Sequence, residues 1–586
     1  MKRIIASLIF ILGALPGLAS IAATPPPDLN ADATLAKLSE EFLDAYLLAR
    51  PQQASALGLH LYDGKVADLS RPALEAEHAR LVNDAREFAA IDHAALGADA
   101  RHRCRVIEAG IQNELFAFDG MQSFTNNPMT YANAVDVNIY LKRDYAPLAD
   151  RMRSIIAVEK AVPAVFAAAR ANLADSLAKP YVELAIEIAN GGADFLAKDL
   201  VAALKEVSDP ALMTEFKATN DRAISELHGY AEWLKQEKLP KAHTHYAIGR
   251  EKYQQMLRGG GLVDLPAEKI LELGLKELKR EQAVFVAAAK QIDRSKPAIQ
   301  VFKEIQRDHP TEASLLTDVR KHLESIRKFV VDHDIVTIPS EVRARTEETP
   351  QFARAGSFAS MDSPGPFETK ATEAYYYVTP TEPSWTPAQK EEWLTSFNYY
   401  TTDVVTIHEA YPGHYVQFLN LNASAVGRAE KIFGSYAFIE GWAHYCEQML
   451  LDEGFGAEGD AVRAAKYRLA QSDEALLRIC RLCVSIKMHC EGMTVADAAK
   501  FFEENCYYEP KPAYQEAMRG TYDPGYLYYT LGKLEILKLR RDWQAQEGAA
   551  YSLKRFNDEM LRHGMPPIRL LREKMLTDPK RWDEVL

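Results

Sequence analysis

Two histidines separated by a proline–glycine pair place the strongest constraint on how this chain folds. The segment reads Thr406-Ile407-His408-Glu409-Ala410-Tyr411-Pro412-Gly413-His414. On an uninterrupted α-helix, residues six positions apart lie about 120° apart around the axis and about 9 Å apart along it, too far to share one metal ion. Proline removes a backbone donor and clashes with the preceding turn, which kinks or ends a helix. The sequence therefore predicts a break at Pro412 and Gly413 that brings His414 back beside His408.

A carboxylate further along the chain completes the ligand set of a catalytic zinc ion. Hydrolytic zinc sites use three protein ligands and leave one position for water, whose pKa the metal lowers toward neutrality. His408, His414 and Glu440 supply that number of ligands. Glu409 lies about 100° around the helix from His408 and is the predicted general base. The apolar residues around the motif indicate burial, which favours a metal site over histidines and acids on solvated helix faces.

Two residues after Glu440 leave the ligand set open. His444 follows Glu440 at i, i+4, so it shares a helix face with that carboxylate. It is either a ligand or a residue that supports one. Glu447 lies on nearly the same face and is able to orient a ligand, but we expect a solvated side chain there.

The first residues of the chain predict export. Two basic residues precede an apolar run from Ile4 to Leu15, and small residues suited to cleavage follow near Ala22. The run is shorter than the roughly 20 residues that cross a bilayer, and no cysteine follows it to take a lipid. We therefore expect a cleaved signal peptide over residues 1–22, a periplasmic or secreted protein, and no stable membrane anchor.

Composition indicates a globular, acidic protein. The chain has 586 residues, of which 47% are hydrophobic and 26% are charged, enough for a large core. Its formal net charge is −13 and it contains no basic run, which disfavours nucleic acid and anionic lipid as partners.

Six cysteines are distributed unevenly, and four of them fall in one short stretch of the C-terminal part. Disulfides persist in exported proteins, so we expect one or two bridges or else buried thiols. Cys480, Cys483 and Cys490 offer a thiolate metal cluster as the alternative. We disfavour that cluster because the stretch has helical patterning and lacks a second close pair of cysteines.

Apolar positions recur at helical spacing over most of the chain. One such run extends from Leu35 to Ala49 and ends before Pro51. Between residues 339 and 387 the pattern changes to β-prone segments bounded by proline and glycine. The sequence predicts a mainly α fold with a small β-sheet or hairpin near the active site. It divides into an N-terminal helical region over 23–340 and a C-terminal region over 341–586 that carries the catalytic core.

The histidine motif, together with Glu440-Gly441-Trp442-Ala443, resembles the signature of the domain of unknown function 885 family. That family is grouped with zincin-type metallopeptidases and is more distantly similar to the carboxypeptidase Taq and oligopeptidase architectures. The resemblance extends over nearly all of the mature chain. It implies a large helical zincin-like metallopeptidase architecture, Zn²⁺ as cofactor, His408, His414 and Glu440 as ligands, and Glu409 as base.

The resemblance also implies residues near the substrate. His489 and Tyr529 are candidates to donate a hydrogen bond to a tetrahedral oxyanion, although a core histidine and a packed tyrosine suit these positions equally. Arg540 is a candidate to pair with a substrate carboxylate through its planar fork. Two positions depart from the family pattern: Ser485 stands where an acid is usual, and Asp523-Pro524-Gly525 replaces the usual run before Tyr529.

These features predict an exported zinc-dependent peptidase that cleaves short peptides with zinc-activated water. The Tyr-rich segment around Tyr376 is predicted to form the edge strand on which an extended substrate lies, since strand addition uses backbone hydrogen bonds. Two alternatives remain: a catalytically silent protein that binds metal or peptide, and an amidase that acts on a non-peptide amide. A serine hydrolase is disfavoured because the chain has no Gly-x-Ser-x-Gly motif.

Overall fold

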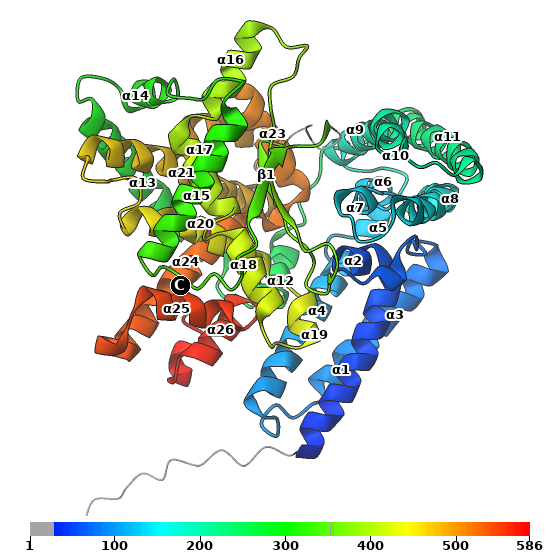
Figure 1. Cartoon of the computed structure of the whole chain (residues 1–586). Coiled ribbons are helices and arrows are strands. Elements are labelled where there is room, and N and C mark those ends of the chain that lie inside the picture. Colours follow the sequence, from blue (N-terminus) through cyan, green and yellow to red (C-terminus); the bar gives the residue numbers. More distant parts are fainter. Residues whose placement is uncertain (1–28, 352–353, 355–356) are drawn as a thin grey trace, which may run out of the picture.

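The computed structural model describes residues 29–351, 354 and 357–586. These residues form a mainly helical molecule with one small sheet, which confirms the predicted secondary-structure class (Figure 1). No helix among them is long and apolar enough to cross a lipid bilayer. The predicted signal peptide, residues 1–22, lies outside the described residues.

The first helices pack around a small core that is separate from the other two. They are α1 (Leu29–Ala49), α2 (Pro51–Ala56), α3 (Arg71–Ala89) and α4 (Ala98–Asp119). The predicted apolar stripe of α1 is buried there, with Leu35, Phe42 and Tyr46 almost fully covered. Pro51 begins α2 at a position where its missing N–H leaves no helical bond unmade. The helix end before Pro51 that the sequence predicts is thus confirmed.

A second group of helices forms a lobe with a separate core. Its members are α5 (Ser123–Asn126), α6 (Met129–Asn133), α7 (Ile139–Lys142), α8 (Leu148–Asn172), α9 (Lys179–Phe195), α10 (Val201–Leu204) and α11 (Pro210–Trp233). The Asp209 carboxylate caps α11 by accepting hydrogen bonds from the backbone N–H groups of Ala211 and Leu212. Such a cap satisfies donors that have no partner inside the helix, which fixes where α11 begins.

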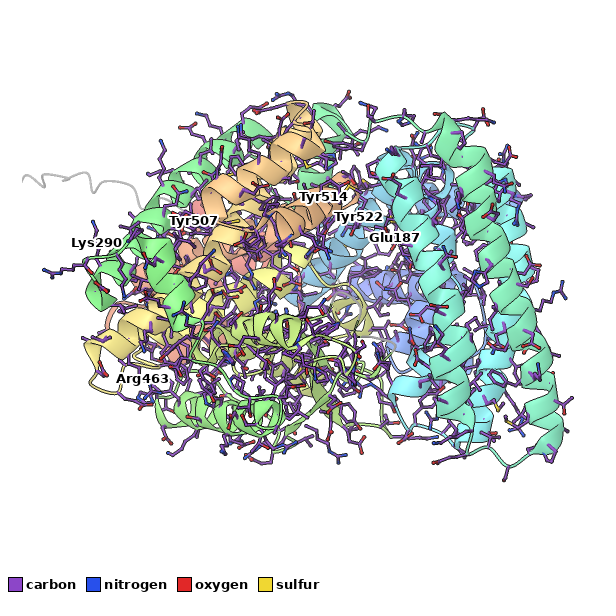
Figure 2. The ribbon with its side chains drawn as sticks, turned by 90° about the horizontal axis from the view of Figure 1, so that it is seen from above. Glu187, Lys290, Arg463, Tyr507, Tyr514 and Tyr522 are labelled. Carbon is purple, nitrogen blue, oxygen red and sulfur yellow. The ribbon has the colours of Figure 1, made fainter. Side chains whose placement is uncertain are left out.

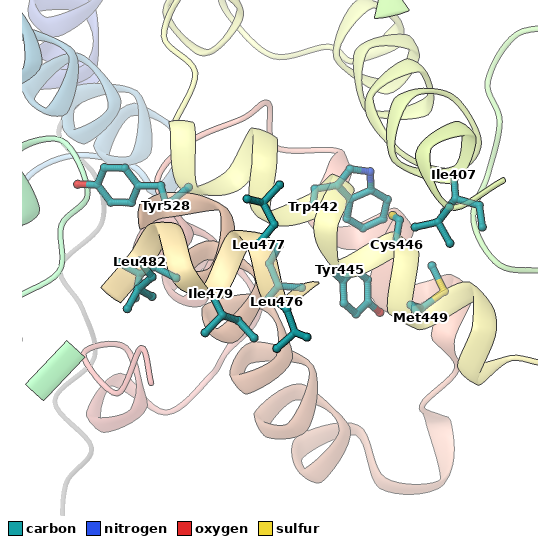
Figure 3. Packing of buried hydrophobic residues seen from close by; sticks show 14 of the residues in the cluster. Ile407, Trp442, Tyr445, Cys446, Met449, Leu476, Leu477, Ile479, Leu482 and Tyr528 are labelled. Atoms are coloured by element: carbon teal, nitrogen blue, oxygen red, sulfur yellow. The ribbon is translucent and has the colours of Figure 1, made fainter. Parts of the chain in front are cut away.

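The remaining helices surround the largest core. They are α12 (Arg250–Gly259), α13 (Ala267–Ile292), α14 (Ala298–Ile305), α15 (Leu315–Asp332), α16 (Pro387–Ser396), α17 (Tyr399–Glu409), α18 (His414–Ala423), α20 (Tyr436–Asp452), α21 (Ala461–Cys490), α22 (Val495–Cys506), α23 (Pro510–Tyr522), α24 (Tyr528–Glu547), α25 (Leu553–Leu561) and α26 (Ile568–Met575). The short α19 (Arg428–Ile432) instead packs into the core of the first helices. Figure 3 shows part of this core, where Ile407 of α17 points toward Cys446 and Met449 of α20. The division at residue 340 stays a prediction, since this core draws residues from both sides of it.

A seam separates the α5–α11 lobe from the C-terminal helices. Figure 2 looks onto it from above, with Glu187 of α9 and Tyr522 of α23 on its two sides. The hydroxyl of Tyr181 on α9 crosses the seam and donates to the backbone carbonyl of Thr521 at 2.8 Å. Both partners of this bond are buried, so the lobe is held to the rest of the molecule by packed contacts.

The small sheet has three strands in the order β1-β3-β2. They are β1 (Ala344–Glu348), β2 (Ala359–Asp362) and β3 (Ala374–Val378). β1 runs parallel to β3, with Thr346 opposite Tyr376, and β2 runs antiparallel to it, with Met361 opposite Tyr376. The Tyr-rich strand is therefore the central one. The prediction that it forms an edge for a substrate is wrong, because it is hydrogen-bonded to another strand on each side. Among the described residues β1 and β2 are the edge strands.

Candidate metal centre

The helix break at Pro412 and Gly413 forms as predicted. α17 ends at Glu409 and α18 begins at His414, so the two histidines lie on different helices. The backbone between them turns so tightly that a Cβ atom on Gly413 would overlap the carbonyl oxygens of Ile407 and His408. The rings of His408 and His414 consequently lie edge to face, with their centroids 4.8 Å apart. The prediction that the break brings these rings together is confirmed.

Three ligand atoms converge beside the break. Glu440 Oε2, from the first turns of α20, lies 3.4 Å from His408 Nε2 and 3.5 Å from His414 Nε2. For a tetrahedral ion with bonds of about 2.0–2.1 Å, two ligand atoms are about 3.3 Å apart. Glu440 Oε2 is buried and has no hydrogen-bond partner among the described residues. A buried carboxylate oxygen left in this way, between two imidazole nitrogens, fits a divalent metal ion.

Glu447 supports this group from behind. Its Oε1 lies 2.7 Å from His408 Nδ1 and its Oε2 lies 3.0 Å from His444 Nδ1. The side chain is fully buried, so the prediction of a solvated residue is wrong. Arg478 of α21 lies 3.3 Å from the same carboxylate. Glu447 thus fixes Nδ1 of His408 as the donor and leaves Nε2 free to bind a metal, as metal-binding histidines require.

His444 is a supporting residue in this geometry. Its Nδ1 is occupied by Glu447, and it does not belong to the group of ligand atoms formed by His408, His414 and Glu440. Burial, followed by the charge of Lys533, lowers the pKa of His444 to about 3, so its ring is neutral. A neutral ring donates to Glu447 without adding a further positive charge beside the centre.

The two carboxylates of the centre raise the pKa of His408 above that of an ordinary imidazole. Burial alone would lower the pKa of His408, but Glu440 and Glu447 raise it to about 9. Burial alone would likewise raise the pKa of Glu447, but Arg478 and the two histidines hold it well below its usual range. The centre is therefore a negatively charged pair of carboxylates that attracts a cation, either a proton or a metal ion.

The predicted base, Glu409, lies at the end of α17 beside the sheet. Its Oε2 accepts a hydrogen bond from the backbone N–H of Met361 in β2 at 3.0 Å. Glu409 directly follows the ligand His408 in the chain, and its carboxylate is held at the edge strand β2 by this bond.

Tyr529 is brought close to the centre, as its predicted role requires. Burial raises the pKa of Tyr529 and so does the nearby carboxylate of Glu440. The guanidinium groups of Arg481 and Arg519 lie over its ring, at 5.0 and 5.7 Å from the centroid. The ring of Tyr436, one turn before Glu440, packs against it at 5.7 Å. Tyr436 and Arg519 therefore contact Tyr529 beside the centre, and neither was predicted from the sequence.

His489 is not brought to the centre. Its Nε2 lies 2.8 Å from the backbone carbonyl of Gly520, and its Nδ1 lies 3.3 Å from the backbone N–H of Ile248. On α21 it lies about 16 Å along the axis from Arg478, which contacts the centre. Ser485, where the family usually has an acid, donates to the carbonyl of Pro524 and meets the hydroxyl of Tyr253 instead. Both ring nitrogens of His489 therefore serve the packing.

The two predicted substrate-binding residues are engaged elsewhere. Tyr376 is 1% exposed, and its hydroxyl pairs with Thr406 Oγ1 at 3.0 Å behind α17. Arg540 donates to the hydroxyl groups of Tyr551 and Tyr445, about 16 Å along α24 from Tyr529. Neither side chain faces the ligand group, so the structure gives no support to a direct contact with substrate.

The cysteines are thiols in this structure. All six are unpaired; five are buried and Cys490 is partly exposed. Of the two predicted alternatives, buried thiols are therefore observed and bridges are not. Cys480, Cys483 and Cys490 form no group that could hold a metal ion.

Fold and site together define a mainly helical protein with a buried centre of two histidines and one glutamate, of the kind that binds a divalent metal ion. The chain belongs to the family described as bacterial protein of unknown function (DUF885), whose model matches residues 51–575. The family predicted from the histidine motif is thus confirmed. No curated protein matches the chain.

Two solved structures share the fold. A lipoprotein of unknown function from Shewanella oneidensis is 24% identical, with a TM-score of 0.77 over 92% of this chain and 99% of its own. A lipoprotein from Colwellia psychrerythraea is 18% identical, with a TM-score of 0.77 over 94% of this chain and 99% of its own. A carboxypeptidase from Pyrococcus furiosus covers 95% of this chain and 98% of its own at 13% identity, and its TM-score of 0.41 is too low to indicate a common fold.

Proposed function

We propose that the protein is an exported zinc-dependent metallohydrolase that cleaves short peptides. The convergence of His408 Nε2, His414 Nε2 and the unpartnered Glu440 Oε2 carries this proposal. Two nitrogens and one carboxylate oxygen suit Zn²⁺, and three protein ligands leave a position for water. The description of both relatives that share the fold as lipoproteins supports export.

The residues around the ligands divide the chemistry of amide hydrolysis between them. A bound Zn²⁺ would supply a Lewis acid that acidifies water and polarises a carbonyl group. Glu409 takes a proton from the attacking water as its oxygen bonds to the carbonyl carbon, and passes it to the leaving amine when the C–N bond breaks. The phenol of Tyr529 donates a hydrogen bond to the carbonyl oxygen as that oxygen gains negative charge.

The edge strand β2 is the proposed platform for an extended substrate. Met361 directs its backbone N–H to Glu409 and away from β3, so the outer edge of β2 borders the base. A peptide that pairs with this edge by backbone hydrogen bonds would place its carbonyl groups beside Glu409 whatever its side chains are. This role replaces the one that the sequence analysis gave to the strand of Tyr376.

Replacing Glu409 by glutamine tests the proposal. We expect Glu409→Gln to retain one zinc ion at the centre and to lose turnover of a peptide library by about 10²- to 10⁴-fold, since the amide cannot take a proton. Mass spectrometry of the digest and metal analysis of the purified protein measure the two quantities. The exposed carboxylate of Glu215 on α11 gives the matched control, Glu215→Gln, which should keep full activity.

Each other outcome has a definite meaning. His408→Ala should lose the metal of this centre together with activity. A wild-type protein that binds zinc and cleaves no peptide, while hydrolysing non-peptide amides, would be an amidase. Zinc binding without any turnover would make it a binding protein, and absence of zinc from the wild type would overturn the metal site itself.

A further inference from the structure

A second group of metal-ligating side chains lies in the first helices, outside the site described above. His93 Nε2 lies 3.2 Å from Glu108 Oε1 and 3.6 Å from Cys104 Sγ. All three ligand atoms lie within 4.8 Å of one another. None of these residues takes part in the proposed hydrolysis. Packing of the first helices does not explain why a histidine, a thiol and a carboxylate meet here.

The distances match those between ligands of a tetrahedral metal ion. With metal bonds of about 2.0–2.1 Å to nitrogen or oxygen and about 2.3 Å to sulfur, the nitrogen lies about 3.4 Å from the oxygen and about 3.6 Å from the sulfur. The observed separations of His93 Nε2 from Glu108 and Cys104 are 3.2 and 3.6 Å. A single imidazole nitrogen that faces both a thiol and a carboxylate has one proton to share, whereas a metal ion would satisfy all three atoms.

The backbone holds these residues in place. Cys104 and Glu108 are four residues apart on α4, so their side chains share one face of the helix. His93 belongs to the segment between α3 and α4, and Arg101 fixes that segment by donating to the carbonyl groups of His93 and Leu96 at 2.8 and 2.9 Å. The ligands are therefore ordered before any ion binds, which reduces the entropic cost of binding.

The group is also accessible. Cys104 is fully buried, but His93 and Glu108 are partly exposed. Glu108 lines a cavity of about 600 Å³ between α4 and α12, which opens to solvent. Two arginines line this cavity, and each is paired with a carboxylate, Arg105 with Glu573 and Arg258 with Asp264. An ion can therefore reach the group from solvent through the partly exposed side chains of His93 and Glu108.

We propose that His93, Cys104 and Glu108 bind a second divalent transition-metal ion, Zn²⁺ being the best match. Thiolate and imidazole ligands select borderline and soft ions over Mg²⁺ and Ca²⁺, which prefer oxygen ligands alone. Three protein ligands leave a fourth position for water. The ion fastens the segment between α3 and α4 to α4, so its main effect is on the stability of the first helices.

Cobalt substitution separates this site from the His408 centre. Co²⁺ bound to a thiolate gives a sulfur-to-metal charge-transfer band in the near ultraviolet, and the His408 centre contains no sulfur. We expect full-length metal-free protein to bind two equivalents of Co²⁺ and to show this band. His408→Ala should keep the band and lose one equivalent, so the result does not depend on the proposed hydrolysis.

Variants of the second group identify its ligands. Cys104→Ser should lose the band and one equivalent of metal, while Cys490→Ser, which alters another unpaired thiol, should keep both. His93→Ala changes a partly exposed side chain and should lower the affinity of this site at least tenfold, which guards against a folding defect at the buried Cys104. A protein without the band, or a band that survives in Cys104→Ser, would overturn the proposal.

Discussion

At the scale of single residues, the centre depends on a carboxylate that the sequence analysis assigned to solvent. The three predicted ligands could be identified because the proline–glycine break has a physical consequence that can be worked out from spacing. The role of Glu447 could not, because it depends on Arg478 and on two histidines that reach it from three helices. Helical spacing places Glu447 on the face of Glu440, but only packing of α17, α20 and α21 decides that this face is buried.

Replacing Glu447 by glutamine should weaken the metal centre without removing a ligand. The amide keeps the size of the side chain but loses the charge that orients His408 and pairs with Arg478, so we expect zinc affinity to fall by about 10- to 100-fold. Competition with a chelator of known affinity measures this change. The control is Glu474→Gln, which alters the other carboxylate paired with Arg478 and leaves the histidines untouched. Equal affinities in the two variants would contradict the supporting role.

At the scale of helices and strands, the sequence pattern correctly predicted features that depend on neighbouring residues. It failed for features that depend on contacts between segments far apart in the chain. The end of α1 before Pro51 and the break between α17 and α18 follow from the chemistry of proline and glycine. The β-prone character of β3 was also predicted correctly. The position of β3 in the middle of the sheet was not predicted. Strand order depends on which segments meet in the folded chain, and the spacing of residues within one strand does not indicate this.

The α5–α11 lobe contains a buried acid whose ionisation opposes folding. Glu159 of α8 is 2% exposed, its Oε1 has no hydrogen-bond partner among the described residues, and Thr219 of α11 donates to Oε2. Burial raises the pKa of Glu159 from 4.5 to about 8. The folded state therefore holds a proton that the unfolded state releases as the pH rises above 4.5. Its contribution is fully favourable below that pH and is lost at about 1.4 kcal/mol per pH unit until pH 8.

Glu159→Gln removes this pH dependence, because the amide does not ionise. We expect the variant to melt at a higher temperature than the wild type at pH 8.5 and at nearly the same temperature at pH 4.5. Thermal unfolding followed by circular dichroism at the two pH values measures the difference. The exposed Glu215→Gln variant, on α11 of the same lobe, should match the wild type at both. A variant that is equally stabilised at both pH values would show that Glu159 does not carry the effect.

At the scale of the whole molecule, the family resemblance predicted the fold and its extent along the chain better than it predicted the residues that line the site. The match over residues 51–575 and the helical architecture agree with it. The implied roles of His489 and Arg540 find no support, because both lie about three turns or more along their helices from residues at the centre. A resemblance in sequence identifies equivalent positions along a helix. A catalytic role also requires that position to lie in the part of the helix that is near the metal.

Removal of metal should loosen the core that the three ligands join. His408, His414 and Glu440 come from α17, α18 and α20, so a bound ion would link the two helices on either side of the break to a third helix. At a zinc concentration about 1,000 times the dissociation constant, binding adds about 4 kcal/mol to the free energy of unfolding. We expect a chelator to lower the melting temperature of the wild type and to do so less in His408→Ala, as scanning calorimetry would record. Equal responses would show that the metal acts elsewhere.

The unpaired thiols have a consequence for how this fold is maintained. Five cysteines are covered by neighbouring side chains and the sixth is partly exposed, and none is joined to another. No disulfide reinforces the described residues, so their cohesion rests on non-covalent packing and on the metal ions proposed above. The shape of this part of the chain therefore does not depend on oxidation of its thiols.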